Sequence, residues 1–134
     1  MTTERNEKLG TWAVPVLRIG LSLVLLWFGL SQLTHPGDWV SWVPGYATAL
    51  SHLSATVLVL GNGILETVLG VALLLGFWTR LVAFLLALHL LHLAITVGYN
   101  DIGVRDFGLA IAMLSVALHG ADTWTLDQKF SRTE

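Results

Sequence analysis

The chain contains no cysteine and few charged residues, and these absences exclude several classes of protein. Without cysteine the chain forms no disulfide, offers no thiol nucleophile and cannot hold an iron–sulfur cluster through its own thiolates. Charged residues make up only 12% of the 134 residues, and no basic patch is large enough to hold a phosphate backbone. We therefore expect no nucleic-acid partner. No cofactor domain and no nucleophile beside a base is recognisable, so catalysis by this chain alone is not expected.

Apolar residues dominate the composition. They make up 54% of the chain and the mean hydropathy is strongly positive, which is typical of an integral membrane protein. Four apolar runs are each near the roughly 20 residues that a helix needs to cross about 30 Å of hydrocarbon. We predict an all-α, membrane-embedded four-helix bundle that forms one domain over residues 1–134. The predicted membrane helices cover about 12–33, 55–78, 81–98 and 102–120.

The segment between the first two predicted helices has its own composition. The sequence "HPG" ends the first helix, because proline cannot continue the backbone ladder. Residues 38–53 then include Trp39, Trp42 and Tyr46, amphipathic aromatics that favour the headgroup layer. We predict that 38–53 lies along the outer membrane surface. Asp101 is the predicted N-cap of the last helix.

Basic residues predict the orientation in the membrane, because Lys and Arg mark cytoplasmic loops. With four crossings and cytoplasmic N- and C-termini, only Arg105 falls outside. The basic residues on or near the cytoplasmic side are then Arg5, Lys8, Arg18, Arg80, Lys129 and Arg132. A signal peptide over residues 1–33 is a weaker interpretation, because the apolar run is longer than about 7–15 residues and no small-residue cleavage site follows.

Glu66 is the main functional candidate, since it is the lone acid in the middle of the second apolar run. A charge at the bilayer midplane costs roughly 2.5–3.5 kcal/mol, so such a residue faces the bundle interior, pairs with a cation or relays a proton. At 1.5 Å per residue, His89 and His92 lie at a similar depth, while Arg18 enters from the cytoplasmic end as the natural counter-ion for Glu66. The predicted ligand or proton-relay residues are Glu66, His89, His92, Arg18, Asn62 and Tyr99.

Position along the helices and helical spacing predict where the other polar residues lie. Arg105, Asp106 and Asp101 are expected at the outer mouth of the bundle. Small or polar residues three and four apart define the predicted inward faces. In the first helix these are Arg18, Ser22, Leu25, Gly29 and Gln32, and in the last they are Asp101, Arg105, Gly108, Ala112, Ser115 and His119.

The histidines raise the question of a metal or haem. His89 and His92 lie three apart on one helix face, so they cannot bind opposite faces of one porphyrin. His119 is near the cytoplasmic end of its helix, far from the midplane. We predict no metal site. A quinone fits better, because its two carbonyl oxygens need donors at membrane depth while its ring packs on aromatic and leucine side chains.

Three segments resemble the DoxX family of small bacterial membrane proteins: "LRIGLSLVLLWFGLSQL", "ETVLGVALLLGFWTR" and "YNDIGVRDFGLAIAMLSVALHG" with the trailing "WTLD". The resemblance implies four membrane helices and the bacterial cytoplasmic (inner) membrane. Some members of this family are subunits of thiosulfate:quinone oxidoreductase and others belong to membrane-bound redox complexes. The residues that match polar positions of the family pattern are Arg18, Glu66, Arg80, Arg105 and Asp106. His89 and His92 are not part of that pattern.

Three functions remain open. The first is a quinone-interacting membrane subunit of a redox complex, in which Glu66 and the histidines bond the quinone and exchange its protons. The second is a non-catalytic membrane anchor or assembly partner whose charged residues hold the bundle together. The third is a small solute or proton carrier. The expected partners are the lipid bilayer and redox-complex subunits; a homo-oligomer is also open.

Overall fold

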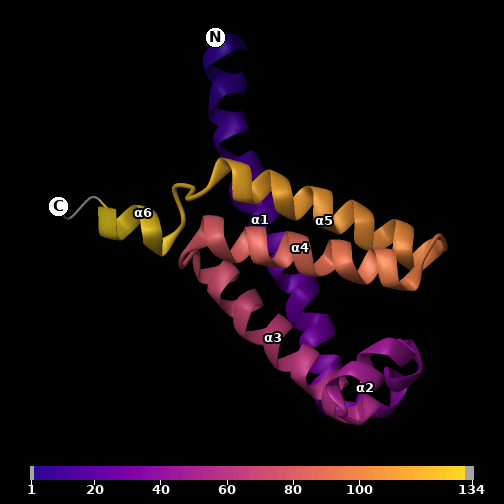
Figure 1. The fold of residues 1–134 in the computed structure, drawn as a ribbon. Coiled ribbons are helices and arrows are strands. Elements are labelled where there is room, and N and C mark those ends of the chain that lie inside the picture. Colours follow the sequence, from indigo (N-terminus) through magenta and orange to yellow (C-terminus); the bar gives the residue numbers. More distant parts are fainter. Residues whose placement is uncertain (1, 132–134) are drawn as a thin grey trace.

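The computed structural model describes residues 2–131 and is all-α (Figure 1). Arg132, one of the residues predicted on the cytoplasmic side, lies outside the described residues. The elements are, in chain order, α1 (Thr2–Thr34), two 3-10 turns η1 (Pro36–Asp38) and η2 (Val40–Trp42), α2 (Gly45–Ser51), α3 (Ala55–Leu75), α4 (Thr79–Val97), α5 (Asp101–His119) and α6 (Leu126–Ser131).

Four of these helices, α1, α3, α4 and α5, are long and apolar enough to cross a membrane. The protein is therefore a multi-pass membrane protein, as predicted. The ends of α3, α4 and α5 lie within three residues of the predicted ones, but α1 begins about ten residues earlier than the apolar run. The added turns contain Glu4, Glu7 and Lys8, which are good helix formers, and these exposed polar side chains need no partner helix.

The four long helices form two pairs. α1 packs along α3, and α4 packs along α5. Figure 1 shows that the pairs meet at one end and spread apart toward the other. The "closed end" comprises the α3–α4 turn (76–78) and the segment after α5 (120–125), and the "open end" comprises the α1–α3 connection (35–54) and the α4–α5 turn (98–100).

Glycine allows the close approach within each pair. A methyl group at Gly29 of α1 would lie 2.5 Å from the Thr67 hydroxyl oxygen of α3, and one at Gly63 would lie 3.0 Å from the Gly29 carbonyl oxygen. In the other pair, a methyl group at Gly103 would collide with the Gly98 carbonyl. Small residues at these positions let the helix backbones pack without the hydrophobic drive that operates in water.

The core between the pairs is apolar. Leu25, Leu73, Leu86 and Met113 come from α1, α3, α4 and α5 in turn, and their exposures are 2%, 0%, 0% and 0%. We call these four side chains the apolar layer. They fill the space between the two helix pairs on the closed-end side of the bundle centre.

The predicted inward face of α1 is confirmed, because Arg18, Ser22, Leu25, Gly29 and Gln32 are all buried. The predicted face of α5 is wrong. Five of its six members are exposed, and the buried face instead carries Gly103, Asp106, Ala110, Met113, Val116 and Ala117. The small residues of this face allow α5 to pack tightly on α4. Close contact between the two helix backbones, and not the position of the polar side chains, therefore determines which face of α5 is buried.

The predicted N-cap of α5 is also wrong by one residue. The Asn100 side-chain oxygen accepts hydrogen bonds from the Ile102 and Gly103 N–H groups, both at 3.0 Å, while Asp101 is exposed in the first turn. Asn and Asp side chains cap helices equally well, and an N-cap residue has non-helical backbone angles. Asn100 has an extended backbone and is therefore the N-cap. The carboxylate of Asp101 still lies favourably near the positive end of the helix dipole.

Arg18 holds the closed end together. Its Nε lies 2.7 Å from Asp122 Oδ2, and both side chains are almost fully buried, with exposures of 1% and 2%. The same guanidinium donates to the carbonyls of Leu73 and Leu74 at 2.8 and 2.7 Å, in the last turn of α3. One side chain of α1 therefore joins the end of α3 to the segment that follows α5.

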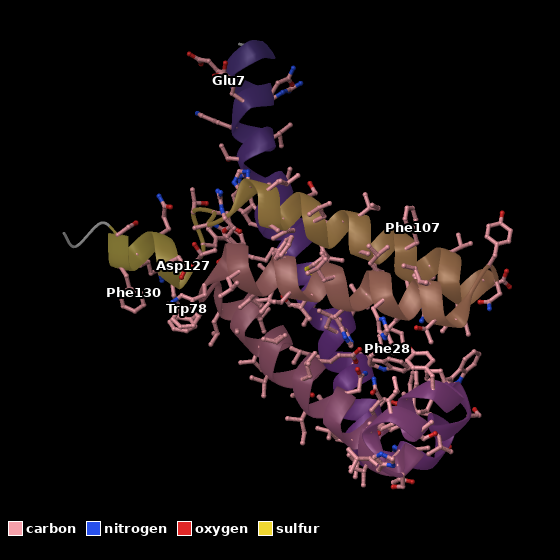
Figure 2. All side chains as sticks on the ribbon, in the orientation of Figure 1. Glu7, Phe28, Trp78, Phe107, Asp127 and Phe130 are labelled. Atoms are coloured by element: carbon pink, nitrogen blue, oxygen red, sulfur yellow. The ribbon has the colours of Figure 1, made fainter. Side chains whose placement is uncertain are left out.

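The start of α4 is fixed by α6. Trp78 adopts a left-handed conformation (φ 47°) that costs a residue with a Cβ roughly 1–2 kcal/mol. The Asp127 carboxylate compensates by accepting hydrogen bonds from the Trp78 and Thr79 N–H groups at 2.8 and 2.7 Å. Figure 2 shows Asp127 next to Trp78. Thr125 packs directly against Gly76, where no larger residue would fit. The polar tail therefore completes the bundle.

We predict that Asp122→Asn strongly destabilises the protein. The change leaves the buried Arg18 guanidinium without its counter-charge, which typically costs about 3–5 kcal/mol. Thermal unfolding of the purified protein in detergent, followed by circular dichroism, measures the effect. Asp101→Asn is the matched control and should change the free energy of unfolding by less than about 0.5 kcal/mol, since Asp101 is exposed. Equal melting temperatures for the two variants would contradict this role of the pair.

Candidate functional site

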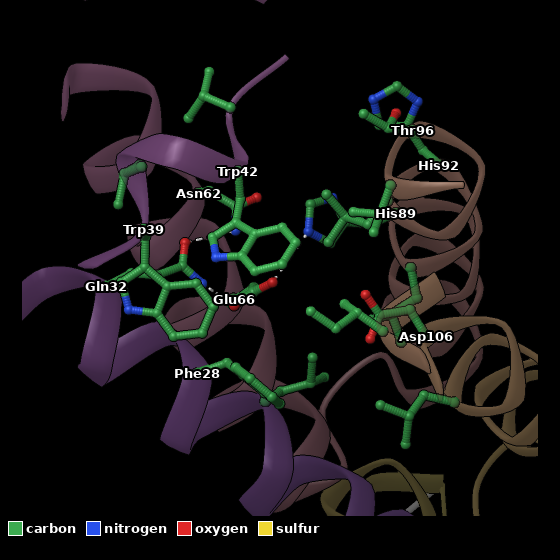
Figure 3. Close-up of a pocket in the computed structure, with 18 of the residues that line it drawn as sticks. Phe28, Gln32, Trp39, Trp42, Asn62, Glu66, His89, His92, Thr96 and Asp106 are labelled. Carbon is green, nitrogen blue, oxygen red and sulfur yellow. Dashed lines mark hydrogen bonds and ion pairs between the residues drawn. The ribbon is translucent and has the colours of Figure 1, made fainter. Parts of the chain in front are cut away.

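A cavity of about 410 Å³ lies between the two helix pairs toward the open end. All four long helices line it, and the α1–α3 connection lies across it. Figure 3 shows Trp39, Trp42 and Gln32 on one side, with His89, His92 and Asp106 facing them. The volume falls within the roughly 300–1,000 Å³ that is usual for small-molecule sites.

The walls are mainly apolar and aromatic. Phe28 of α1 packs edge-on against Trp39 of the connection, with ring centroids 5.7 Å apart. Trp39 is held by a hydrogen bond of 3.2 Å from its indole N–H to Ser31 Oγ. Leu25 and Met113 of the apolar layer also line the cavity. A flat apolar group would thus find ring faces and aliphatic side chains around it.

Glu66 is the centre of a polar network on the cavity wall. The residue is 3% exposed. Gln32 Nε2 donates to its Oε2 at 2.8 Å, and His89 Nε2 lies 3.3 Å from its Oε1. The Asn62 amide donates to Gln32 Oε1 at 2.7 Å. The network thus joins α1, α3 and α4, and His89, with a side chain 17% exposed, lies at its border with the cavity.

Arg18 does not take part in this network, and its expected pairing with Glu66 is wrong. Gln32, which contacts Glu66, lies fourteen residues after Arg18 on α1, which is about 21 Å along the helix axis. No arginine side chain bridges that distance. Arg18 instead pairs with Asp122, a residue in the tail that the sequence reasoning left without a role.

His92 belongs to a second polar group near the open end. Tyr46 of α2 places its hydroxyl 3.1 Å from His92 Nε2 and 3.1 Å from Thr96 Oγ1. All three residues line the cavity. Tyr46 therefore connects the segment lying across the cavity to α4.

Arg105 and Asp106 pair with each other. Arg105 Nη2 lies 2.8 Å from Asp106 Oδ1, and the Asp106 side chain is buried while that of Arg105 is 44% exposed. The Arg105 guanidinium lies 4.8 Å from the Phe28 ring centroid, a cation–π contact between α5 and α1. Both residues line the open-end part of the cavity.

Besides Arg18, two further predicted site residues lie outside the cavity. The Tyr99 side chain is fully exposed and does not line the cavity, because the chain turns at Gly98 and directs Tyr99 outward. Asp101 is exposed in the first turn of α5 and likewise does not line it.

Sequence reasoning missed Gln32, Tyr46 and Thr96 as site residues. Gln32 carried a usable signal, because an amide within an apolar span needs hydrogen-bond partners and Gln32 is four helical turns from Arg18 on the same face. Tyr46 carried none, since an interfacial aromatic looks the same whether it faces lipid or folds back over a cavity.

The site combines hydrogen-bonding groups and titratable groups beside apolar walls. Gln32, Asn62 and Tyr46 can donate or accept, and Glu66 with His89 can hold or pass a proton. Among residues 2–131, no three His, Asp or Glu side chains come together as a metal-binding group. The arrangement is therefore suited to a small, mostly apolar molecule with a few polar atoms.

Comparison with known proteins identifies the family. The DoxX family model matches residues 13–99, which run from within α1 to just past the end of α4 and include Glu66, His89 and His92. No curated protein and no solved structure matches the chain. Since the match covers well over half of the 134 residues, the chain belongs to the DoxX family.

Proposed function

We propose that the protein is a quinone-interacting membrane subunit of a redox complex in the bacterial cytoplasmic membrane. The observation that carries the proposal is the contact between Glu66 and His89 on the wall of an apolar cavity inside the bundle. A buried acid is costly in a membrane, and such residues commonly mark ligand sites or proton relays.

The cavity lining matches a quinone in chemistry. The ring of a quinone is flat and apolar, and Phe28, Trp39 and Trp42 offer aromatic faces for it. Its two oxygens accept hydrogen bonds, and the imidazole of His89 and the hydroxyl of Tyr46 are donors on the cavity wall. A hydrophobic tail on the quinone would remain in the bilayer.

Glu66 and His89 would serve the proton part of the reaction. Reduction of a quinone to a quinol takes up two electrons and two protons. A protein redox partner in the complex would supply the electrons, and the Glu66–His89 pair would supply or accept protons at the ring oxygen. Gln32 holds the carboxylate of Glu66 in place, which keeps its second oxygen directed at His89.

One observation favours a second candidate, a membrane anchor or assembly partner. The buried Asp122 and Asp106 are paired with Arg18 and Arg105 within this chain, so these charges stabilise the bundle and need no ligand. In that case the Glu66 network would be a further structural contact between helices.

We predict that Glu66→Gln weakens quinone binding by about ten- to a hundredfold. A hydrogen bond to a charged group contributes about 1.5–3 kcal/mol, and 1.4 kcal/mol is a factor of ten. The measurement is quenching of tryptophan fluorescence by decylubiquinone and by menadione, since Trp39 and Trp42 line the cavity. Glu7→Gln, on the exposed first turns of α1, is the control and should bind as the native chain does.

The same variant separates the two candidates. If the protein is an anchor, Glu66→Gln lowers thermal stability or the yield of the complex, and the native chain shows no saturable quenching. Saturable binding that is identical in Glu66→Gln and the native chain would refute the role of Glu66 in the quinone proposal.

Tyr46→Phe should release quinone faster. The change removes the hydroxyl that joins α2 to His92 and Thr96, a contribution of about 0.5–1.5 kcal/mol, so the dissociation rate should rise about two- to tenfold. Stopped-flow fluorescence measures this rate. Tyr99→Phe is the matched control, because Tyr99 lies outside the cavity. Equal rates in the two variants would show that Tyr46 does not retain the ligand.

A further inference from the structure

The cavity ends at the apolar layer on its closed-end side. Each of the four long helices carries a polar residue on the cavity wall and, nearer the closed end, a member of the apolar layer. The pairs are Gln32 with Leu25 on α1, Glu66 with Leu73 on α3, His89 with Leu86 on α4, and Asp106 with Met113 on α5. Three of these spacings are seven residues, which is about 10 Å along a helix. The apolar layer thus separates Glu66 from the closed end.

Toward the open end, partly exposed polar side chains stand among the apolar residues that line the cavity. Tyr46 is 48% exposed, the Arg105 side chain is 44% exposed, and His92 is also exposed. These residues line the same cavity as Glu66. Water in contact with the α1–α3 connection therefore meets polar groups that extend to Glu66, whereas water at the closed end meets four tightly packed side chains.

We propose that the cavity is a one-sided aqueous vestibule, open to water only at the membrane face that carries the α1–α3 connection, with Glu66 near its blind end. Protons and small hydrophilic molecules reach Glu66 from that face alone. Given the proposed function, on which this step rests, protons exchanged with the quinone come from or go to that face. With the orientation predicted from the basic residues, it is the outer face.

The one-sided opening also bears on the carrier hypothesis. A carrier has to connect its site to both membrane faces in turn, which requires one helix pair to move against the other. Here the closed end is joined by the buried Arg18–Asp122 pair and by the capping of α4 by Asp127. These bonds oppose opening at that end.

The absence of cysteine allows a direct test by single-cysteine labelling. Leu93→Cys places a thiol on the cavity wall, one turn from His89, without altering the polar network. Ile95→Cys is the matched control, since it lies at nearly the same depth on α4 but is 73% exposed on the outside of the bundle. Leu86→Cys probes the apolar layer. Asp38→Cys and Lys129→Cys, both exposed, report the two membrane faces.

The reagent is a membrane-impermeant, charged methanethiosulfonate, applied to right-side-out and to inside-out vesicles. Remaining thiols are counted after denaturation with a mass-tagged maleimide. We expect Leu93→Cys to react from the same side as Asp38→Cys and not from the side of Lys129→Cys. Ile95→Cys and Leu86→Cys should react roughly a hundredfold more slowly, because hydrocarbon and tight packing exclude a charged reagent.

Three results would overturn the vestibule: reaction of Leu93→Cys from the Lys129 side, reaction from both sides, or a rate no higher than that of Ile95→Cys. Leu58→Cys, which lines the cavity from α3, repeats the test in case Leu93→Cys does not fold. The labelling needs no quinone. If the labelling contradicts the vestibule while the quinone still binds, only the vestibule is wrong. If the labelling agrees with the vestibule but no quinone binds, only the proposed function is wrong.

Discussion

The rest of this structure depends on one interaction, the buried ion pair between the Arg18 guanidinium and Asp122. A buried cation among apolar helices is tolerated only when the protein itself supplies its counter-charge and its hydrogen-bond acceptors. Asp122 supplies the charge, and the carbonyls of Leu73 and Leu74, in the last turn of α3, supply the acceptors. The same bonds fix the position of α1 relative to α3 and to the end of α5, and so bring both helix pairs together at the closed end.

The open end follows from that arrangement. The pairs are joined at the closed end and spread apart from it (Figure 1). Their facing surfaces leave a cavity beyond the apolar layer. Here the polar contacts between the pairs are fewer: Glu66 with His89 on one side and Arg105 with Phe28 on the other. Tyr46 adds a contact from the connection. The bundle therefore combines a rigid base with a site whose walls are bridged by single side chains.

The sequence predicted the helices well because length and hydropathy are properties of each segment alone. The burial of Glu66 beside His89 also followed from depth along the helices. The partner of Arg18 did not, since Asp122 lies 104 residues away in a tail whose polar composition suggested solvent. Likewise, the inward face of α5 depends on which surface of α4 it meets, and the fold of the connection over the cavity depends on contacts of Trp39 with α1 and of Tyr46 with α4. Such long-range pairings leave no periodic signal in the sequence.

The most direct test of the central claim is native mass spectrometry of the protein extracted gently from its own membrane. If the cavity holds a quinone, the native chain should carry a retained mass equal to that of the quinone of the host membrane, and Glu66→Gln should lose it. A chain that carries no such mass, or carries it equally with Glu66→Gln, would contradict the proposal that Glu66 and its cavity form a quinone site.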